Sequence, residues 1–333
     1  MKKNLIALAV LAASGVAMAQ STVTLYGVAD AWIGQTSSTN AAGVKVKQTK
    51  VDSGAFNGSR WGLKGAEDLG GGMKAVFTLE SGFDISNGSV GSVLFGRQAF
   101  VGLESGFGSV TLGRQYTAYD ALRGATNQAF DTDFATTGGV WANGIDYAPR
   151  ANNSIAYTSP SFGGISGAVV YGLGENKNLA PANAGGNATD NLSLHVKYAN
   201  GPVLVGYAYQ EEKQAAALGA TQDKNKYNLI AGSYDFGVAA LTGGYNQAKN
   251  NTTKDNEFQV GVSVPFGAAS VALGYAHSKS VVSGATTKTE GYSLTGLYDL
   301  SKRTGLYAGL SNVKQKESSE KSSLFAVGVR HSF

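Results

Sequence analysis

Large apolar residues alternate with small or polar residues along most of this chain, in segments of about ten residues that end at turn residues. Val203, Val205 and Tyr207 share one face of their segment, for example, whereas Gly206 and Ala208 lie on the other. A period of two is typical of β-strands. The alternation predicts sixteen strands, at residues 22–34, 59–69, 72–83, 94–105, 108–114, 152–159, 165–172, 190–199, 202–210, 224–234, 238–247, 255–264, 270–279, 287–299, 304–314 and 321–333.

Periodicity alone leaves two architectures open, because a large apolar face points to the core in a soluble sandwich and to lipid in a membrane barrel. The connections distinguish them, since short and longer connections alternate along the chain. The short ones are 70–71, 106–107, 160–164, 200–201, 235–237, 265–269 and 300–303, and the longer ones are 35–58, 84–93, 115–151, 173–189, 211–223, 248–254, 280–286 and 315–320. Tight turns at one end and longer loops at the other are typical of a transmembrane barrel. We therefore predict an all-β fold, a 16-stranded antiparallel transmembrane β-barrel.

One connection, residues 115–150, is unusually long and has no sustained period. It combines aromatic residues such as Tyr119 and Trp141 with several carboxylates, a mixture too rich for a solvated linker. A barrel of sixteen strands is too wide for side chains to fill, so its interior holds water. We predict that this loop folds and narrows the space that the strands enclose; a plain external loop is the alternative.

The first 19 residues have the pattern of a cleaved secretory signal peptide. Lys2 and Lys3 precede an apolar run at 5–16, and Ala17-Met18-Ala19 provides the small residues of a cleavage site. A membrane anchor is the alternative, but the run is too short to span hydrocarbon. No later segment offers about 18 consecutive apolar residues, so no membrane helix is expected. The mature chain is then a single domain, residues 20–333.

The amino-acid composition is compatible with a membrane barrel and excludes several other kinds of protein and site. Glycine contributes 46 of 333 residues, about double the usual share, and only 15% of residues are charged. The absence of cysteine excludes disulfides, thiolate metal sites and thiol nucleophiles. The net charge of +4 comes without a basic stripe, so no nucleic-acid partner is expected. Aromatic residues lie beside the short turns, as an interfacial girdle requires: Phe107, Phe162, Tyr198, Tyr234, Phe236, Phe266 and Tyr298.

Several segments resemble the general porins of Gram-negative outer membranes, most closely the β-proteobacterial and neisserial branch. They are TLYGVADAW (24–32), SRWGLKGAEDLGGG (59–72), LFGRQAFVGLESGFGSVTLGRQY (94–116), NNSIAYTSPSFGG (152–164) and VGVRHSF (327–333). The resemblance implies a homotrimer of sixteen-stranded barrels, each with its third external loop folded into the lumen as a constriction. Residues 115–150 match that loop by position. The C-terminal Phe333 resembles the family's insertion signal for assembly.

The resemblance also implies that wall arginines face loop carboxylates at the constriction. Arg60, Arg97 and Arg150 match the wall arginines by motif, and alternation places Arg60, Lys64 and Arg150 on the lumen side. The alternation around Arg97 is poor, and a solvated arginine near a loop is the alternative for each. On the loop side, Asp120 matches a family acid and Asp131 and Asp133 match loosely, while Tyr116 and Arg114, at the junction of strand and loop, complete the expected set.

The sequence shows no arrangement of residues that is typical of a catalytic site. The histidines, at 195, 277 and 331, lie far apart on different strands, and no serine nucleophile with a local base stands out. Asp131-Thr132-Asp133 could hold Ca²⁺, but the rest of a calcium-loop pattern is missing. Neither a cofactor nor a resident metal is therefore expected.

The sequence predicts a passive, water-filled outer-membrane channel for small hydrophilic solutes and ions, with weak anion selectivity. Membrane lipid and lipopolysaccharide would surround it. An outer-membrane barrel enzyme and a secreted all-β adhesion or sugar-binding module are the alternatives.

Overall fold

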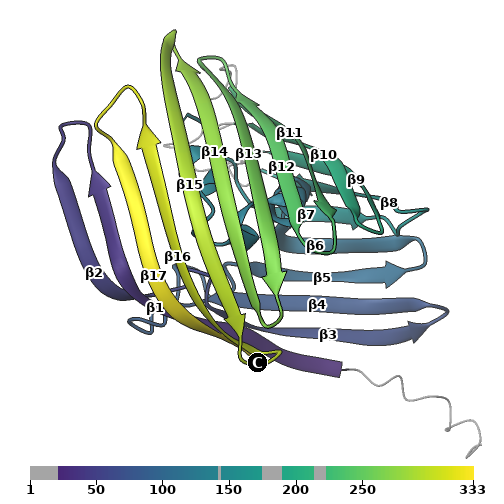
Figure 1. Cartoon of the computed structure of the whole chain (residues 1–333). Coiled ribbons are helices and arrows are strands. Elements are labelled where there is room, and N and C mark those ends of the chain that lie inside the picture. The colour runs from purple at the N-terminus through teal and green to yellow at the C-terminus, as the bar shows by residue number, and fades with distance from the viewer. Residues whose placement is uncertain (1–21, 142–143, 175–189, 214–222) are drawn as a thin grey trace, which may run out of the picture.

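The computed structural model describes residues 22–141, 144–174, 190–213 and 223–333, so the predicted signal peptide lies outside the described residues. These residues form 17 strands and three short helical segments (Figure 1). The strands are β1 (Thr22–Thr39), β2 (Lys45–Ser53), β3 (Arg60–Gly70), β4 (Met73–Gly82), β5 (Gln98–Ser105), β6 (Gly108–Tyr116), β7 (Arg150–Thr158), β8 (Ile165–Gly172), β9 (Asn191–Asn200), β10 (Val203–Lys213), β11 (Lys224–Asp235), β12 (Ala240–Lys249), β13 (Thr253–Phe266), β14 (Ala269–Val282), β15 (Ala285–Asp299), β16 (Thr304–Gln315) and β17 (Lys321–Ser332). The helical segments are α2 (Ala118–Thr126), the 3₁₀ turn η1 (Ala129–Asp131) and α3 (Thr137–Val140).

The strands form one closed antiparallel ring. From β3 onward each strand pairs with the next, and β1 pairs with β17 from Val28↔Ser332 to Thr39↔Lys321. Both β2 and β3 pair with β1, β2 along its second half and β3 along its first half. Because β2 and β3 share one place in the ring, the 17 strands occupy sixteen positions. The predicted sixteen-stranded barrel is therefore confirmed.

The prediction of one long loop at 35–58 was wrong. β1 continues to Thr39, β2 returns beside it, and only 54–59 leaves the sheet before β3 begins. Asp30 of β1 anchors both ends of segment 54–59, because its carbonyl oxygen accepts from Gly54 N (3.0 Å) and from Ser59 Oγ (3.0 Å). Most residues of β2 are exposed, so no strongly apolar face marked it as a strand in the sequence.

Other boundaries also differ from the sequence prediction. The connections expected at 248–254 and 280–286 shorten to 250–252 and 283–284, because β12 and β14 end later than predicted, at Lys249 and Val282, and β13 and β15 begin earlier, at Thr253 and Ala285. The turn at 283–284 has positive φ at both residues, 49° and 89°, as a tight two-residue hairpin requires. At the other extreme, β5 begins at Gln98 rather than at 94, so Arg97 precedes its strand.

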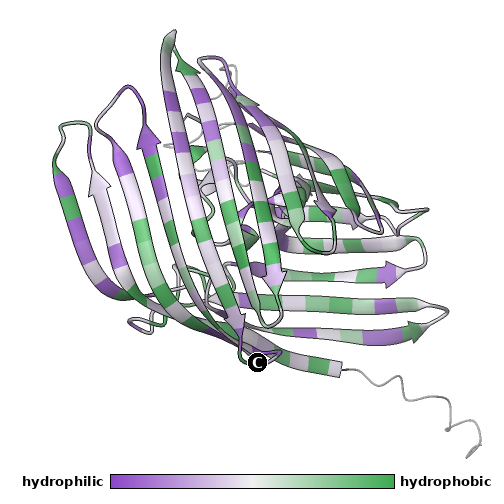
Figure 2. Ribbon diagram, in the orientation of Figure 1, coloured by the Kyte–Doolittle hydropathy of each residue, from purple (hydrophilic) through white to green (hydrophobic). Residues whose placement is uncertain are grey.

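The two faces of the barrel differ as a membrane protein requires. Large apolar residues are exposed on the outer face, with 49% of Val196 and 54% of Phe325 accessible, whereas small residues such as Ala208 and Ala326 face inward and are buried. Figure 2 shows the resulting alternation of hydrophobic and hydrophilic residues along the strands. No helix within the described ranges is long and apolar enough to cross a membrane.

Candidate functional site

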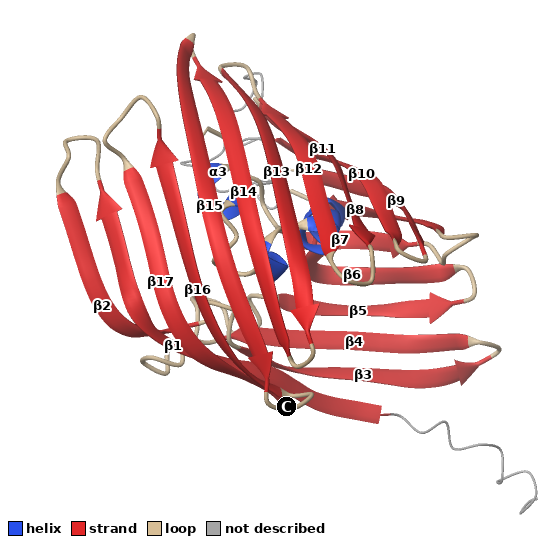
Figure 3. Cartoon of the chain, viewed as in Figure 1, coloured by secondary structure: helices blue, strands red, loops and turns tan. Residues whose placement is uncertain are grey.

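The connection between β6 and β7 lies against the inner face of the barrel, where Figure 3 shows its helices. Wall side chains hold its backbone: Ser193 Oγ accepts from Tyr119 N (2.8 Å), and Gln259 Nε2 donates to the carbonyl oxygen of Thr126 (2.7 Å). Asp255 Oδ2 accepts from Ile145 N at 3.1 Å. These contacts come from β9 and β13, so the loop is tied to one side of the lumen.

Glycines in the wall make room for this loop. A Cβ at Gly274 would lie 1.4 Å from Gln128 Oε1, and one at Gly291 would lie 2.5 Å from Thr136 Cβ. Side chains there would collide with the loop, so the small residues of β14 and β15 serve a packing role as well as lining the lumen.

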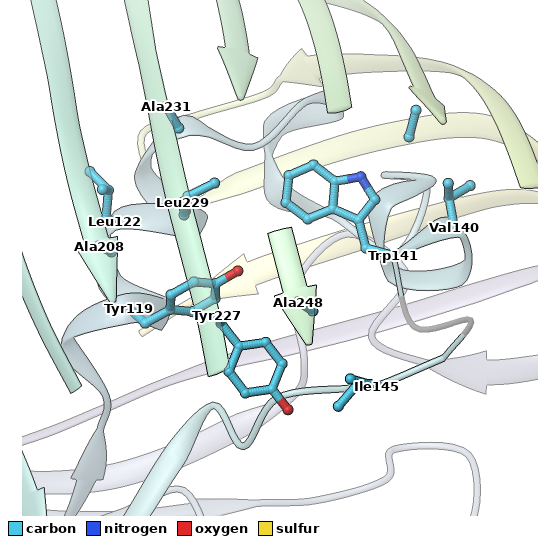
Figure 4. Close-up of a cluster of buried hydrophobic side chains, with 11 residues drawn as sticks. Tyr119, Leu122, Val140, Trp141, Ile145, Ala208, Tyr227, Leu229, Ala231 and Ala248 are labelled. Atoms are coloured by element: carbon cyan, nitrogen blue, oxygen red, sulfur yellow. The ribbon is translucent and has the colours of Figure 1, made fainter. Parts of the chain in front are cut away.

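An apolar cluster also holds the loop against the barrel wall. Tyr119, Leu122 and Trp141 of the loop pack with Tyr227 and Leu229 of β11 (Figure 4), and all five are at most 7% exposed. Burying side chains of this size contributes about 1.5–3 kcal/mol each. The loop is therefore a folded part of the barrel rather than an external segment.

The tip of the loop reaches the far side of the lumen and meets the inward-folded segment 54–59. Asp133 N donates to the carbonyl oxygen of Ala55 at 3.0 Å, and the rings of Phe130 and Phe56 lie 6.0 Å apart. Three consecutive residues at this tip, 129–131, have positive φ between 50° and 59°, a conformation that costs free energy in non-glycine residues. The loop thus bridges the lumen and leaves the wall from β3 to Arg150, the first residue of β7, as the free wall.

Basic side chains from that free wall form one group that hydrogen bonds and ion pairs connect. Arg97 Nε donates to Glu80 Oε1 at 2.7 Å, and Arg60 Nε lies 3.8 Å from Glu80 Oε2. The hydroxyl oxygen of Tyr116 accepts from Arg97 Nη2 (2.7 Å) and from Arg150 Nη2 (2.6 Å), and the Arg150 guanidinium lies 4.3 Å from the centre of the Tyr116 ring. The three arginines expected from the motifs are therefore brought together.

The other two basic residues border this group. Lys64 Nζ lies 5.2 Å from the centre of the Tyr26 ring, and Tyr26 donates its hydroxyl hydrogen to Glu80. Arg114 donates from Nε to the carbonyl oxygen of Gly96 at 2.7 Å and from Nη1 to Asn152. Arg114 lies on β6 and so belongs to the wall rather than to the loop, as does Tyr116 at the end of that strand.

The loop carboxylates are not paired with these arginines. Asp120 accepts from the Tyr147 hydroxyl at 2.6 Å, and Asp131 accepts from Asn127 Nδ2 at 2.7 Å. Burial raises the pKa of both carboxyl groups. Among the described residues, no ion pair joins Asp120, Asp131 or Asp133 to a wall arginine.

Asp133 has the most perturbed carboxyl group of the three. It is accessible to water in the lumen, but protein surrounds it on most sides. This confinement, together with repulsion from Asp30, Asp131 and Asp52, raises its pKa to about 6. Asp133 also borders a cavity of about 610 Å³ that Arg97 and Arg114 line.

Sequence reasoning missed two charged residues of the site. Glu80 is the carboxylate that joins Arg60 to Arg97, and its signal was a single acid within the apolar run KAVFTLESGF. Arg123 lies on the loop, with its guanidinium 5.8 Å from the Trp141 ring and 5.5 Å from the Tyr147 ring. No periodic pattern in the loop sequence signalled that position.

The remaining candidates occupy separate places. His195 Nδ1 lies 2.7 Å from the Ala118 carbonyl oxygen and helps to anchor the loop, His277 stacks on Phe258 on the outer face, and His331 contacts Thr304. Within the described ranges, no three His, Asp or Glu side chains are arranged to hold a metal ion.

Comparisons with known proteins place this geometry in a family. A sequence model of Gram-negative porins matches residues 6–318. Outer membrane porin protein 32 of Delftia acidovorans is 36% identical, with 100% of both chains covered. The chain belongs to the Gram-negative porins. An outer membrane porin protein of Bordetella pertussis is 34% identical over the full length of both chains.

Among solved structures, the anion-selective porin from Comamonas acidovorans matches with a TM-score of 0.82 and 28% identity, covering 94% of this chain and 100% of that one. This porin is accordingly an outer-membrane protein that forms a passive channel for small hydrophilic solutes, as predicted from the sequence. Its relatives are channels rather than enzymes, and neither the barrel-enzyme nor the secreted-module alternative is favoured.

Proposed function

We propose that the channel prefers anions and that Arg60, Arg97 and Arg150, with Lys64 beside them, form its selectivity element. The observation that carries this proposal is the excess of positive charge in this group, where Arg60 and Arg97 share the carboxylate of Glu80 and Arg150 and Lys64 add two further positive charges beside Tyr116 and Tyr26. Arginine stays protonated at all physiological pH values, so the positive charges are permanent.

The loop carboxylates oppose this preference weakly. Asp120 and Asp131 engage Tyr147 and Asn127 of the loop itself, and Arg123 lies close enough to both to stabilise their charge. In a narrow passage of reduced dielectric constant, fixed charges act more strongly than on an open surface. The similarity to a solved porin described as anion-selective supports the same sign of selectivity.

A charge series tests this proposal. We expect Arg60→Ser/Arg150→Ser to move the reversal potential in a KCl gradient toward cations and Glu80→Gln to move it toward anions. The control variant Lys302→Ser/Arg303→Ser also removes two positive charges, but at an exposed turn, and should leave the reversal potential unchanged. If the wall variant and the turn variant behave alike, the arginines do not set the selectivity.

The outer face supports a second element of the proposal, assembly into a homotrimer embedded in membrane lipid and lipopolysaccharide. Around β1 and β17 this face holds an apolar groove of about 430 Å³ lined by Ile33, Leu306 and Val327. Burying such surfaces between barrels would give a large, stable interface. Light scattering from complexes in mild detergent should give the mass of three chains, and a monomer mass would contradict this assembly.

A further inference from the structure

The outer face carries a feature that channel function leaves unexplained, a regular set of lysines near the loop ends of seven neighbouring strands, β11–β17 (Figure 1). On each strand, a lysine lies four residues beyond a large apolar residue of the same face, toward the loop. The pairs are Ile230 and Lys226, Tyr245 and Lys249, Phe258 and Lys254, Tyr275 and Lys279, Tyr292 and Lys288, Leu310 and Lys314, and Phe325 and Lys321. We call these seven lysines the lysine rows.

The strand register places lysines of the rows directly opposite one another. Lys249 of β12 faces both Lys226 of β11 and Lys254 of β13. On the following strands, Lys279 faces Lys288, and Lys314 faces Lys321. Opposite residues of antiparallel strands have Cβ atoms about 4.5–5.5 Å apart, and like charges in that position are destabilising.

Protein carboxylates neutralise only part of this charge. Glu211 lies 2.8 Å from Lys224 and 3.6 Å from Lys226, and Glu290 lies 2.9 Å from Lys316. In the part of the chain that the structure describes, the other six lysines of the rows form no ion pair, and all six are exposed: Lys249, Lys254, Lys279, Lys288, Lys314 and Lys321. Glu290 faces Lys314 in the register but bonds to Lys316 instead.

The position of the lysine rows along the strands indicates the kind of partner. At a strand rise of about 3.3 Å, four residues place each ammonium group roughly 13 Å along the strand from its apolar neighbour. Three of these neighbours form a continuous aromatic patch, with ring centres 5.7 Å apart for Phe258 and Tyr275 and 4.9 Å apart for Tyr275 and Tyr292. Aromatic side chains favour the boundary between hydrocarbon and headgroups, which puts the lysines at headgroup level.

We propose that the lysine rows on β11–β15, away from the groove proposed to pack between barrels, bind the phosphate groups of outer-leaflet lipid, with opposed ammonium groups sharing a phosphate. The inference rests on the proposal that the outer face contacts lipid, and it adds the residues and the chemical group. A phosphate between two lysines turns their mutual repulsion into two charge-assisted contacts. A lipid suits the site better than a free anion, because its acyl chains reach the aromatic patch below.

Binding of a bisphosphorylated lipid A to the detergent-solubilised trimer tests the proposal, with dephosphorylated lipid A as the probe that lacks the recognised group. We expect Lys279→Gln/Lys288→Gln and Lys249→Gln/Lys254→Gln each to weaken binding of the bisphosphorylated lipid by about tenfold or more. The matched control, Lys302→Gln/Arg303→Gln, removes two exposed charges at the opposite end of the barrel and should bind normally. Each measurement includes a chelator, so that divalent cations cannot bridge lipid to carboxylates.

Thermal stability gives a second readout, because the effect of the lysine substitutions on stability should reverse when lipid is added. Without phospholipid or lipid A, removing an opposed lysine pair should leave the barrel equally stable or more stable, since repulsion is relieved. With bisphosphorylated lipid A, the same variants should melt below the unmodified protein, because they lose ligand stabilisation. Stability that falls equally in both conditions would show a purely structural role and overturn the proposal.

Other outcomes would also contradict it. If the row variants and the control variant lose lipid binding equally, the attraction is nonspecific. If the dephosphorylated lipid binds as well as the bisphosphorylated lipid, the lysines do not recognise phosphate. Displacement of lipid by inorganic phosphate at similar concentration would show that the rows take a free anion instead. Conductance of the same variants in planar bilayers separates the two proposals, since the row variants should conduct normally even if lipid recognition fails.

Discussion

At the scale of single residues, the wall arginines differ from ordinary surface charges because hydrogen bonds and ion pairs fix their positions. The hydroxyl oxygen of Tyr116 accepts from both Arg97 and Arg150, and Glu80 holds Arg97 and the neighbouring Arg60. Charges held in this way act on every ion that passes, whereas a mobile side chain averages its field over many positions. The selectivity proposed for the channel therefore depends on these partners as well as on the arginines.

Asp133 should make that selectivity depend on pH. Its pKa is raised to about 6, so the carboxyl group is ionised at pH 7.5 and largely neutral at pH 5. Loss of this negative charge from the lumen should strengthen the preference for anions as the pH falls through about 6. Reversal potentials measured between pH 5 and 7.5 should show this transition, and Asp133→Asn should lack it.

Asp84 offers a control for the pH prediction. Hydrogen bonds from Ser86 lower the pKa of this exposed carboxyl group, so it stays ionised over the same range. Asp84→Asn should therefore keep the transition near pH 6. A transition that persists unchanged in Asp133→Asn would assign the titration to another group.

The residues of the site were predictable to different degrees. Arg60 could be placed because strand alternation puts it on a known face and the motif agrees. Arg150 could be placed by its motif but not by alternation, since a register shift between Ala151 and Ser154 breaks the alternation there. Asp120 and Asp131 could be assigned to the loop but not oriented, since their partners Tyr147 and Asn127 depend on a loop fold without a period. For the same reason Arg123 was not foreseen.

At the scale of elements, the contact between the loop and β15 depends on the absence of a side chain at one position. A Cβ at Gly291 would overlap Thr136 and Val140 of the loop. Gly291→Ala should lower the free energy of unfolding by about 1–3 kcal/mol and alter single-channel conductance, because the loop must shift into the passage. Gly296→Ala on the same strand meets no atom closer than 3.9 Å and is the control.

Equal conductance and stability in the two glycine variants would show that the loop does not depend on this contact. The melting temperature and the conductance should be measured on the same preparations, so that poor folding is not mistaken for a moved loop.

The elements themselves followed from the sequence where one face of a strand is apolar. Phe325, Val327 and Val329 alternate with smaller residues, and the strand predicted there is present as β17. The prediction failed where strands continue beyond the apolar band. In β2 and at the loop end of β13 polar residues such as Lys254 stay in the ladder, although their polarity resembles that of a loop.

At the scale of the whole molecule, the barrel closes where its first and last strands meet. The backbone N–H groups of Gly27 and Phe333 each donate to the other residue's carbonyl oxygen at 3.1 Å, and the Phe333 ring lies over Gly27, where a Cβ would be 2.4 Å from Cζ. Phe333→Ser removes this packing, for a loss of about 1–2 kcal/mol from a half-exposed ring. Heat-modifiability gels should show less folded barrel in the outer membrane, whereas normal amounts would exclude an assembly role for Phe333.

The proposed selectivity depends on a water-filled passage in which fixed wall cations outweigh the loop carboxylates. The most direct test is the reversal potential of the unmodified protein in a planar bilayer that separates two KCl concentrations at pH 7.5. We expect discrete conductance steps and a reversal potential whose sign shows that Cl⁻ crosses more readily than K⁺. A potential with the sign of K⁺ preference would contradict it.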